Sequence, residues 1–213
     1  MRQLLTDYRV FWQEFRGNFH STGAVLPSGR LLAKSLCRFV AAPGPPKSIL
    51  EVGPGTGAVT SQIVRSLRGQ DRLDLVELNK AFVARLNERF SDEPQFTCVA
   101  DRCRVLHQTV ESLPAAEKYD LIVSGLPLNN FSVATVEHLL GVLLSLLKPG
   151  GQLSFFQYIA IRQARWLVSG REERARLRGI TRALQNILGP HEIRRDWVWP
   201  NVPPAWVHHV QVS

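Results

Sequence analysis

The sequence has little that would cross-link a protein, anchor it in a membrane or export it. Its three cysteines, Cys37, Cys98 and Cys103, form neither a CxxC pair nor a set with metal-ligand spacing, which argues against disulfides and a zinc site. No run reaches the roughly 18 uncharged apolar residues of a membrane span. The N-terminal stretch MRQLLTDYRVFWQEFR is too polar for a signal peptide. We therefore expect reduced thiols in a cytosolic protein that is soluble or peripheral to a membrane.

Acidic residues are also scarce. The chain has 26 Lys and Arg against 18 Asp and Glu, which gives a formal net charge of +8. Such a balance favours an anionic partner, either nucleic acid or a membrane surface that carries acidic lipids, and does not distinguish between them. The 213 residues are enough for one α/β domain with a full core.

Short apolar runs alternate with helical periodicity along most of the chain. Strands are expected at Ser48–Val52, Leu73–Glu77, Cys103–His107, Tyr119–Val123 and Gln152–Tyr158. Helices are expected at Pro27–Val40, from the glycine-rich turn to about Arg68, at Lys80–Phe90 and at Val133–Leu147. Two closing strands, Ile193–Trp199 and Ala205–Val212, have the pattern of an antiparallel hairpin at the sheet edge. This alternation predicts an α/β fold with a doubly wound, seven-stranded, mostly parallel sheet.

Two segments differ from this alternating pattern. Near the N-terminus, apolar residues recur at helical spacing and form one face, made of Leu4, Leu5, Tyr8, Phe11, Trp12 and Phe15. This amphipathic helix either packs on its own domain or lies in a lipid interface. Residues 162–182 hold seven arginines against two glutamates and predict a basic helical insert at about 160–190. We expect residues 1–46 to supply the N-terminal helix and a cofactor lid, and residues 47–213 to form the main domain.

The segment ILEVGPGTGAVT places Gly53, Gly55 and Gly57 between a strand and a helix. Such a turn lets backbone N–H groups and a helix N-terminus approach a nucleotide-like ligand closely. The same residues fit the dinucleotide pattern GxGxxA, with Glu77 at the distance of a ribose-binding acid, so an NAD-dependent oxidoreductase is a competing interpretation. Glu51 favours S-adenosylmethionine, because a carboxylate there suits a cationic sulfonium and would repel a pyrophosphate.

Together with VELN, SGLP and LLKPGG at later strands, the glycine segment resembles the class I S-adenosylmethionine-dependent methyltransferases. The resemblance covers about Lys47 to Val212 and implies a Rossmann-like fold with S-adenosyl-L-methionine as cofactor. It implies a set of cofactor-binding residues: Ser28, Glu51, Gly53, Gly55, Thr56, Gly57, Glu77, Leu78, Thr109, Val110 and Ser124. The chain departs from the family after the third strand, where Thr109 and Val110 stand in place of the acid that usually binds the adenine amine.

The stretch SGLPLNNF, residues 124–131, follows the fourth strand, where an acceptor would bind. In methyltransferases that act on the amino groups of bases, this stretch has a polar residue two places before the proline and an aromatic ring directly after it. That ring stacks on the extruded base. Here Gly125 and Leu128 occupy these positions, and we expect Phe131 to be a core residue. The stretch therefore predicts a flexible amine, which hydrogen-bond acceptors would orient.

GAVLPSGR upstream of the glycine segment, SGLPLNNF and the C-terminal NVPPAWV resemble the bacterial phospholipid N-methyltransferases and their ornithine-lipid relatives. This resemblance implies N-methylation of a lipid head-group amine, in phosphatidylethanolamine or ornithine lipid, by a peripheral enzyme on the cytoplasmic face of the membrane. It implies an anionic membrane surface as partner, with no nucleic acid and no metal. An RNA methyltransferase like the rRNA adenine N6-dimethylases, which share the fold and the Leu-Pro turn, is the alternative. A non-catalytic binding module on the same fold is a third.

We predict Ser124 and Asn130 as catalytic residues of this acceptor site. The predicted substrate-binding residues are His20, Leu126, Pro127, Asn129 and Tyr158. His208 and His209 are neighbours in a strand, so their side chains point to opposite faces, and we expect them to be structural.

Overall fold

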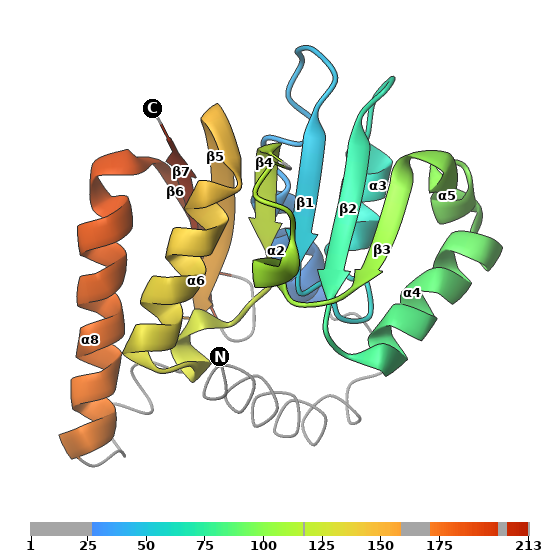
Figure 1. The fold of residues 1–213 in the computed structure, drawn as a ribbon. Helices are drawn as coiled ribbons and strands as arrows, with labels where there is room; N and C mark the ends of the chain where they lie inside the picture. The colour runs from blue at the N-terminus through green and yellow to red at the C-terminus, as the bar shows by residue number, and fades with distance from the viewer. Residues whose placement is uncertain (1–26, 117, 159–170, 200–203, 213) are drawn as a thin grey trace.

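The computed structural model describes residues 27–116, 118–158, 171–199 and 204–212. Its seven strands form one sheet in the order β3-β2-β1-β4-β5-β7-β6 (Figure 1). The strands are β1 (Ser48–Val52), β2 (Arg72–Glu77), β3 (Cys103–His107), β4 (Tyr119–Ser124), β5 (Leu147–Tyr158), β6 (Glu192–Val198) and β7 (Ala205–Gln211). The predicted seven-stranded, mostly parallel sheet is therefore confirmed.

The strands from β1 to β5 pair with one another in parallel, whereas β7 is antiparallel to both of its neighbours, β5 and β6. Because two reversals cancel, β6 runs in the same direction as β1 and β4. The predicted closing hairpin thus joins the sheet through its second strand, and β6 is the outer edge. The carboxyl ends of β1, β2, β4, β5 and β6 consequently lie along one edge of the sheet.

Helices cover both faces of the sheet. The helices are α2 (Pro27–Leu36), α3 (Thr60–Ser66), α4 (Lys80–Asp92), α5 (Pro94–Thr97), α6 (Val133–Ser145) and α8 (Arg171–Leu188). One core lies between the sheet and the pair α6 and α8, which lie side by side (Figure 1). The other core lies beneath α2, α3, α4 and α5. In β1, the fully buried neighbours Ile49 and Leu50 face these two cores, which is why the strand appears as a continuous apolar run.

Element ends differ from expectation where local chemistry decides them. The helix predicted to reach Val40 ends at Leu36 and continues as turns. Helix α4 starts at the predicted residue because Asn79 caps it, with its side-chain oxygen accepting the Ala81 N–H at 2.9 Å. Strand β5 begins at Leu147, five residues before the predicted start, because Leu147 already pairs with Tyr119 ahead of an irregularity that ends at Gln152.

The two histidines of β7 point to opposite faces, as predicted. The His209 ring is buried and hydrogen-bonds Ser154 Oγ at 2.7 Å. His208 instead stacks on Phe155 and hydrogen-bonds the Glu192 carboxylate at 2.7 Å. Both fasten the hairpin to the rest of the sheet.

Several predictions fall on parts of the chain that lie outside the described residues. They are the N-terminal amphipathic helix with His20, and the arginines Arg162 and Arg165 of the basic segment. The backbone of Ser28 starts α2, but its side chain is also outside the description. The later part of the basic segment is helical, as predicted, in α8.

Candidate active site

Three predicted cofactor motifs meet at the carboxyl edge of the sheet. They are the glycine loop (residues 53–57) after β1, Glu77 at the end of β2, and the segment after β3. A small hollow opens between them, lined by Val52, Gly53, Val76, Glu77, Leu78, Gln108, Thr109, Val110 and Leu126. The topology thus brings together residues at or just after the ends of four separate strands, at the position where open α/β sheets bind their ligands.

The glycine loop takes a backbone path that side chains would obstruct. Gly53, Gly55 and Gly57 have φ of 70°, 58° and 86°, in the left-handed region that glycine adopts at little cost. A Cβ at Gly53 would lie 2.7 Å from Leu126 Cδ2, and one at Gly57 would lie 2.6 Å from Arg89 Nη1. At Gly55 a Cβ would meet no protein atom within 4 Å, so the middle of the loop faces open space that a ligand can fill.

Glu77 sits at the mouth of the hollow with a fixed carboxylate. Its Oε1 accepts the Asn79 N–H at 2.7 Å and its Oε2 accepts the Gly55 N–H at 3.0 Å. Burial raises the pKa of this carboxyl, and the backbone N–H groups oppose that shift. A carboxylate has about four lone-pair sites, so two remain for the ribose hydroxyls that the resemblance assigns to it.

Glu51 lies deeper than the sequence argument assumed. The side chain is fully buried beneath the loop, and Thr60 Oγ1 donates to its Oε2 at 2.7 Å. Burial raises the pKa of Glu51 to about 8, so at neutral pH the carboxyl is mainly protonated rather than the expected carboxylate. Its Oε1 has no hydrogen-bond partner among the described residues. An orphaned buried oxygen of this kind fits a ligand that brings a cationic donor, which would draw the group back to its charged form.

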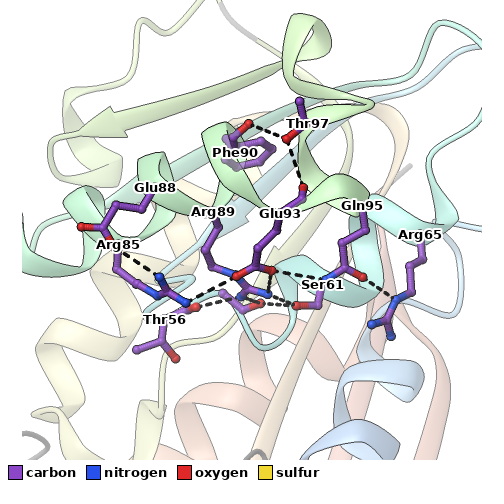
Figure 2. Close-up of polar contacts among 11 residues, drawn as sticks. Thr56, Ser61, Arg65, Arg85, Glu88, Arg89, Phe90, Glu93, Gln95 and Thr97 are labelled. Carbon is purple, nitrogen blue, oxygen red and sulfur yellow. Dashed lines mark hydrogen bonds and ion pairs between the residues drawn. The ribbon is translucent and has the colours of Figure 1, made fainter.

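Arg89 of α4 holds the glycine loop in place, a role that the sequence did not reveal. Its Nη1 donates to the carbonyl oxygens of Thr56 at 2.9 Å and Gly57 at 2.8 Å (Figure 2). The Glu93 carboxylate, one helical turn later, accepts hydrogen bonds from Arg89 Nε and Nη2, each at 2.9 Å. The guanidinium also lies 4.1 Å from the centre of the Phe96 ring. Because Arg89 is 32 residues from Gly57 in sequence, helical spacing alone gave no signal for this contact.

The segment after β3 supplies one wall of the hollow. Thr109 and Val110 line it, together with Leu78 after β2, and Thr109 Oγ1 is engaged with Ser112 Oγ at 3.0 Å. The cofactor-binding roles of these three residues remain predictions. Gln108, which was not predicted, also lines the hollow and directly precedes Thr109 in the motif that lacks the usual acid.

The turn after β4 is built against the glycine loop. A Cβ at Gly125 would lie 2.6 Å from the Gly53 carbonyl oxygen, so glycine is required there by the close approach of two backbones. From sequence, Gly125 was interpreted only as the loss of a polar residue, and the structure supplies this other reason. Leu126 packs over Gly53 and lines the hollow, and Pro127 follows it. Ser124 is fully buried, and its hydroxyl accepts the Leu126 N–H at 3.4 Å, which helps to shape the turn. Its catalytic and cofactor-binding roles remain predictions.

The two asparagines of the turn occupy different environments. Asn129 is buried, and its Nδ2 donates to the Tyr158 carbonyl oxygen at 3.4 Å. This hydrogen bond joins two residues that were predicted to bind the methyl-accepting substrate. Asn129 Oδ1 is buried and has no hydrogen-bond partner within the part of the chain that the structure describes. Asn130, predicted to be catalytic, is exposed in the short helical turn η3 (Leu128–Asn130). Burial raises the pKa of the Tyr158 phenol, so this side chain stays neutral.

Leu128 and Phe131 are both core residues. Each is 1% exposed and packs in the cluster beneath α6 and α8. Phe131 therefore has the core position expected for it. In the described part of the turn, no aromatic ring is left to stack on a flat acceptor.

A second residue that was not predicted, Arg176 of α8, fixes this turn. Its Nη1 donates to the Phe131 carbonyl oxygen at 2.6 Å and to the Asn129 carbonyl oxygen at 3.0 Å. The composition of residues 162–182 indicated a solvated or lipid-facing basic helix, and Arg176 shows that at least one of its arginines is directed inward. Nothing in its helical spacing separated it from its neighbours.

Another hollow, of about 280 Å³, lies elsewhere, between α8 and strands β5 and β7. Residues such as Phe155, Gln157, Leu184 and Trp206 line it, and none of the predicted cofactor residues does. Within the described ranges, no three His, Cys, Asp or Glu side chains are grouped to hold a metal ion.

Comparison with known proteins agrees with this geometry. Residues 49–151 match the family model described as a methyltransferase domain. The ornithine lipid N-methyltransferase of Singulisphaera acidiphila is 26% identical over 147 residues, which are 69% of this chain and 76% of that protein. The ribosomal RNA small subunit methyltransferase A of a Synechococcus species is 44% identical over 63 residues, only 29% of this chain and 22% of that protein.

Among solved structures, the N-methyltransferase NodS of Bradyrhizobium japonicum, determined with S-adenosyl-L-homocysteine, superposes with a TM-score of 0.63. It is 20% identical and covers 87% of this chain and 88% of its own, a likeness that concerns the fold. The predicted resemblance to class I methyltransferases is therefore confirmed, and so are their fold and S-adenosyl-L-methionine as the cofactor.

Proposed function

We propose that this class I methyltransferase transfers a methyl group from S-adenosyl-L-methionine to the primary amine of a membrane lipid head group, in phosphatidylethanolamine or ornithine lipid. The observation that carries the proposal is the extent of the lipid-enzyme match. It spans 69% of the chain, whereas matches to rRNA enzymes span 24% to 45%. The likeness to the lipid enzyme thus extends over a larger part of the chain than the likeness to the rRNA enzymes.

The donor end is suited to its ligand before any ligand binds. The cofactor, when bound, supplies an electrophilic methyl group on a cationic sulfonium. Glu77 has lone pairs left for the ribose hydroxyls, and open space lies beside Gly55. The orphaned Glu51 Oε1 offers a buried acceptor for a cationic group. These residues of the chain therefore fit the sulfonium, amino and ribose parts of this cofactor.

At the acceptor end the chain supplies orientation rather than strong base chemistry. An amine attacks only through its lone pair, so it must arrive neutral and point that pair along the line of the breaking bond. We propose that Asn129 Oδ1, buried and without a partner, accepts an N–H of the amine. Satisfying such an atom recovers roughly 1–3 kcal/mol. The backbone carbonyl oxygen of Tyr158 accepts a hydrogen bond from Asn129 Nδ2 and so holds the amide group in place. In this proposal Asn130, on the exposed side of the turn, binds the rest of the head group.

The burial of Leu128 favours a lipid amine over a base. Enzymes that methylate a flipped base hold it between flat side chains. Here the residue in the stacking position is an aliphatic side chain sealed in the core. The rRNA alternative retains support from the short, higher-identity match, so the experiment below includes RNA.

The place of the reaction follows from the acceptor. No helix among the described residues has the length and apolar character needed to cross a bilayer. We propose a peripheral enzyme that works on the cytoplasmic face of the membrane. In this proposal, residues 1–46 carry a membrane-associated helix and the cofactor lid, and residues 47–213 form the catalytic domain.

The proposal is tested with methyl-labelled S-adenosyl-L-methionine in one mixture of phosphatidylethanolamine, ornithine lipid and small-subunit rRNA. We expect label in an amine-bearing lipid, and chromatography of the lipid fraction identifies which lipid and how many methyl groups are added. An Asn129→Ala variant should retain cofactor affinity, measured by calorimetry, and lose most of its transfer rate. Label found only in the RNA would refute the lipid assignment.

A further inference from the structure

Three tryptophans form one cluster on the outer edge of the sheet. Trp197 of β6 stacks on Trp206 of β7 with ring centres 5.0 Å apart, and Trp199 meets Trp197 edge-on at 5.5 Å. Trp197 is 58% exposed and Trp199 is 65% exposed. We call this cluster the aromatic edge. The described residues include only two other exposed large hydrophobic side chains, Leu31 and Ile193, and Ile193 belongs to the same strand.

Exposed rings on an edge strand have a cost in water. Large apolar side chains are usually buried, and neighbouring exposed ones mark surfaces that contact something else. An outer strand also leaves one row of backbone groups unpaired, so sequences usually place charges on it rather than aromatic rings. Burial inside this protein does not explain Trp197 and Trp199, because more than half of each residue is open to solvent.

The aromatic edge lies on the same side of the molecule as the candidate active site. Strand β6 runs parallel to β1 and β4, and Trp197 is next to its last residue, Val198. The glycine loop and the acceptor turn follow the carboxyl ends of β1 and β4. A flat partner that touches Trp197 and Trp199 would therefore also face the edge of the sheet where the methyl group is transferred.

Basic residues flank the rings. Arg194 and Arg195 of β6 have side chains that are each 50% exposed, and the Arg195 guanidinium lies 5.8 Å from the Trp206 ring centre. Helix α8 borders the same region, since it shares a hollow with Arg195 and Trp206, and it adds the exposed Arg178 and Arg182. On the face of β6 that carries Trp197, three arginines (Arg178, Arg182 and Arg195) thus stand against one carboxylate, Glu192, because Arg194 and Asp196 alternate to the other face. The surplus of positive charge complements an anionic surface.

The arrangement suits a lipid interface better than single-stranded nucleic acid. Base stacking needs free ring faces, but one face of Trp197 is covered by Trp206. The cations nearest the rings are also engaged: Arg194 pairs with Asp196 at 2.7 Å and Arg195 with Glu192. The aromatic edge is therefore a compact apolar surface with a small excess of positive charge around it. Indole rings with such a border match the interfacial region of a bilayer.

We propose that the aromatic edge inserts into the interface of an anionic lipid bilayer and turns the active-site edge toward the head groups. The inference rests on the proposed lipid methyltransferase function and adds the surface that presents the enzyme to its substrate. It is independent of the N-terminal helix, because all of its residues lie in the closing hairpin and in α8.

The first experiment is sedimentation of the full chain with vesicles of phosphatidylcholine and phosphatidylglycerol. A Trp197→Ala/Trp199→Ala double variant should bind them roughly tenfold or more weakly, because two interfacial rings are lost. Leu31→Ala, which removes an exposed side chain from α2, is the matched control and should bind as the wild type does. Calorimetric cofactor binding verifies that the variants are folded. Equal vesicle binding by wild type and double variant would overturn the proposal.

A second readout does not depend on weakened binding. With Trp12 and Trp166 replaced by phenylalanine, the remaining tryptophans are those of the aromatic edge. Vesicles of brominated lipid should then quench their fluorescence, whereas unquenched emission from bound protein would contradict insertion. Loss of single-stranded RNA binding in the double variant, with vesicle binding intact, would assign the surface to RNA instead.

The proposal and the lipid-methylating function fail in different ways. Methyl transfer to a short-chain lipid dissolved as monomers needs no bilayer, so the double variant should retain the wild-type rate on it. Wild-type transfer to lipid together with vesicle binding that does not depend on the tryptophans would refute the surface alone. Tryptophan-dependent vesicle binding without transfer to any lipid would support the surface and refute the proposed function.

Discussion

The glycine loop and the acceptor turn are held by the same device but from different parts of the chain. In each, one arginine donates from Nη1 to two backbone carbonyl oxygens: Arg89 to Thr56 and Gly57, and Arg176 to Asn129 and Phe131. Arg89 comes from α4, within the alternating strands and helices that form the cofactor half. Arg176 comes from α8, in the arginine-rich segment ahead of the closing hairpin.

We call each of these two arginines a clamp, and the two clamps differ in which part of the protein holds them. Arg89 is 12% exposed and bound at both ends by Glu93, inside a network that reaches Ser61 (Figure 2). The glycine loop, which is the donor loop of the site, is therefore stabilised by the core of the domain. Arg176 connects the acceptor turn to α8, which belongs to the arginine-rich segment of the chain. The position of the acceptor turn thus depends on a segment whose composition indicated only surface attraction.

The largest effect is expected when the donor loop itself is changed. Gly55→Val should abolish measurable cofactor binding, a loss of roughly a hundredfold or more, because φ of 58° strains a branched residue and its side chain fills the ligand's space. Gly69→Val is the matched control, since Gly69 also has positive φ and open space but lies away from the site. Calorimetric titration with S-adenosyl-L-homocysteine measures both, and normal affinity in Gly55→Val would remove the loop from the cofactor site.

Removing the clamp of the donor loop should have a smaller effect. Arg89→Ala deletes two charge-assisted hydrogen bonds to loop carbonyls and should weaken cofactor affinity roughly tenfold to a hundredfold. Arg85→Ala, on the same helix but exposed and paired only with Glu88 and Glu93, should change it little. If the two variants bind the cofactor equally well, the loop does not need its clamp.

Removing the clamp of the acceptor turn should affect a different constant. Arg176→Ala should lower kcat/KM for the lipid roughly tenfold, because a displaced turn misaligns the amine, while cofactor affinity stays near the wild-type value. Arg182→Ala, an exposed arginine of the same helix, is the control. A parallel loss of cofactor affinity in Arg176→Ala would mean that the two regions are not separately stabilised.

The smallest effect is a pH dependence confined to the donor side. The ordinary pKa of Glu51 is 4.5 and burial raises it to about 8, so between these values the folded state binds a proton that the unfolded state has lost. The free energy of unfolding should therefore fall as pH rises through this window, by on the order of 1 kcal/mol per pH unit near its middle. Glu51→Gln should flatten this slope in denaturation at pH 5, 6.5 and 8, with the exposed Glu88→Gln as control. A slope unchanged by Glu51→Gln would show that another group causes it.

The same carboxyl links pH to cofactor affinity. A cationic ligand favours the charged form of Glu51, so wild-type affinity should rise as pH approaches about 8 and binding should release a proton. Calorimetry in two buffers with different ionisation enthalpies measures that proton. Glu51→Gln should show no such release.

The sequence was a good guide to the strands and a poor guide to long-range polar contacts. Strands β1 and β3 both have the predicted bounds, although β1 is buried and β3 is only partly buried. The glycine loop was equally clear, since three glycines within five residues after a strand indicate a tight turn with positive φ. Arg89 and Arg176 could not be found this way, because their roles depend on which carbonyl groups the fold brings near them.

Some predictions identified the right residue but assigned the wrong environment. Glu51 was taken as an ionised carboxylate, yet composition gives no measure of the burial that raises its pKa. Ser124 was chosen for its hydroxyl, and register with Val52 places it inside the sheet instead. Phe131 has the core position expected for it, and Leu128 is buried as well, although no core position was predicted for Leu128.

The contact between Gly53 and Gly125 gives the two half-sites a shared frame of reference. The Gly125 N–H bonds the Val52 carbonyl oxygen at 2.8 Å, and no side chain separates the two backbones. The spacing between the glycine loop and the start of the acceptor turn is thus set by main-chain atoms and not by the side chains of residues 128–131. A descendant of this protein could exchange one amine for another by altering that short stretch, and inherit the alignment of the reacting atoms without having to evolve it again.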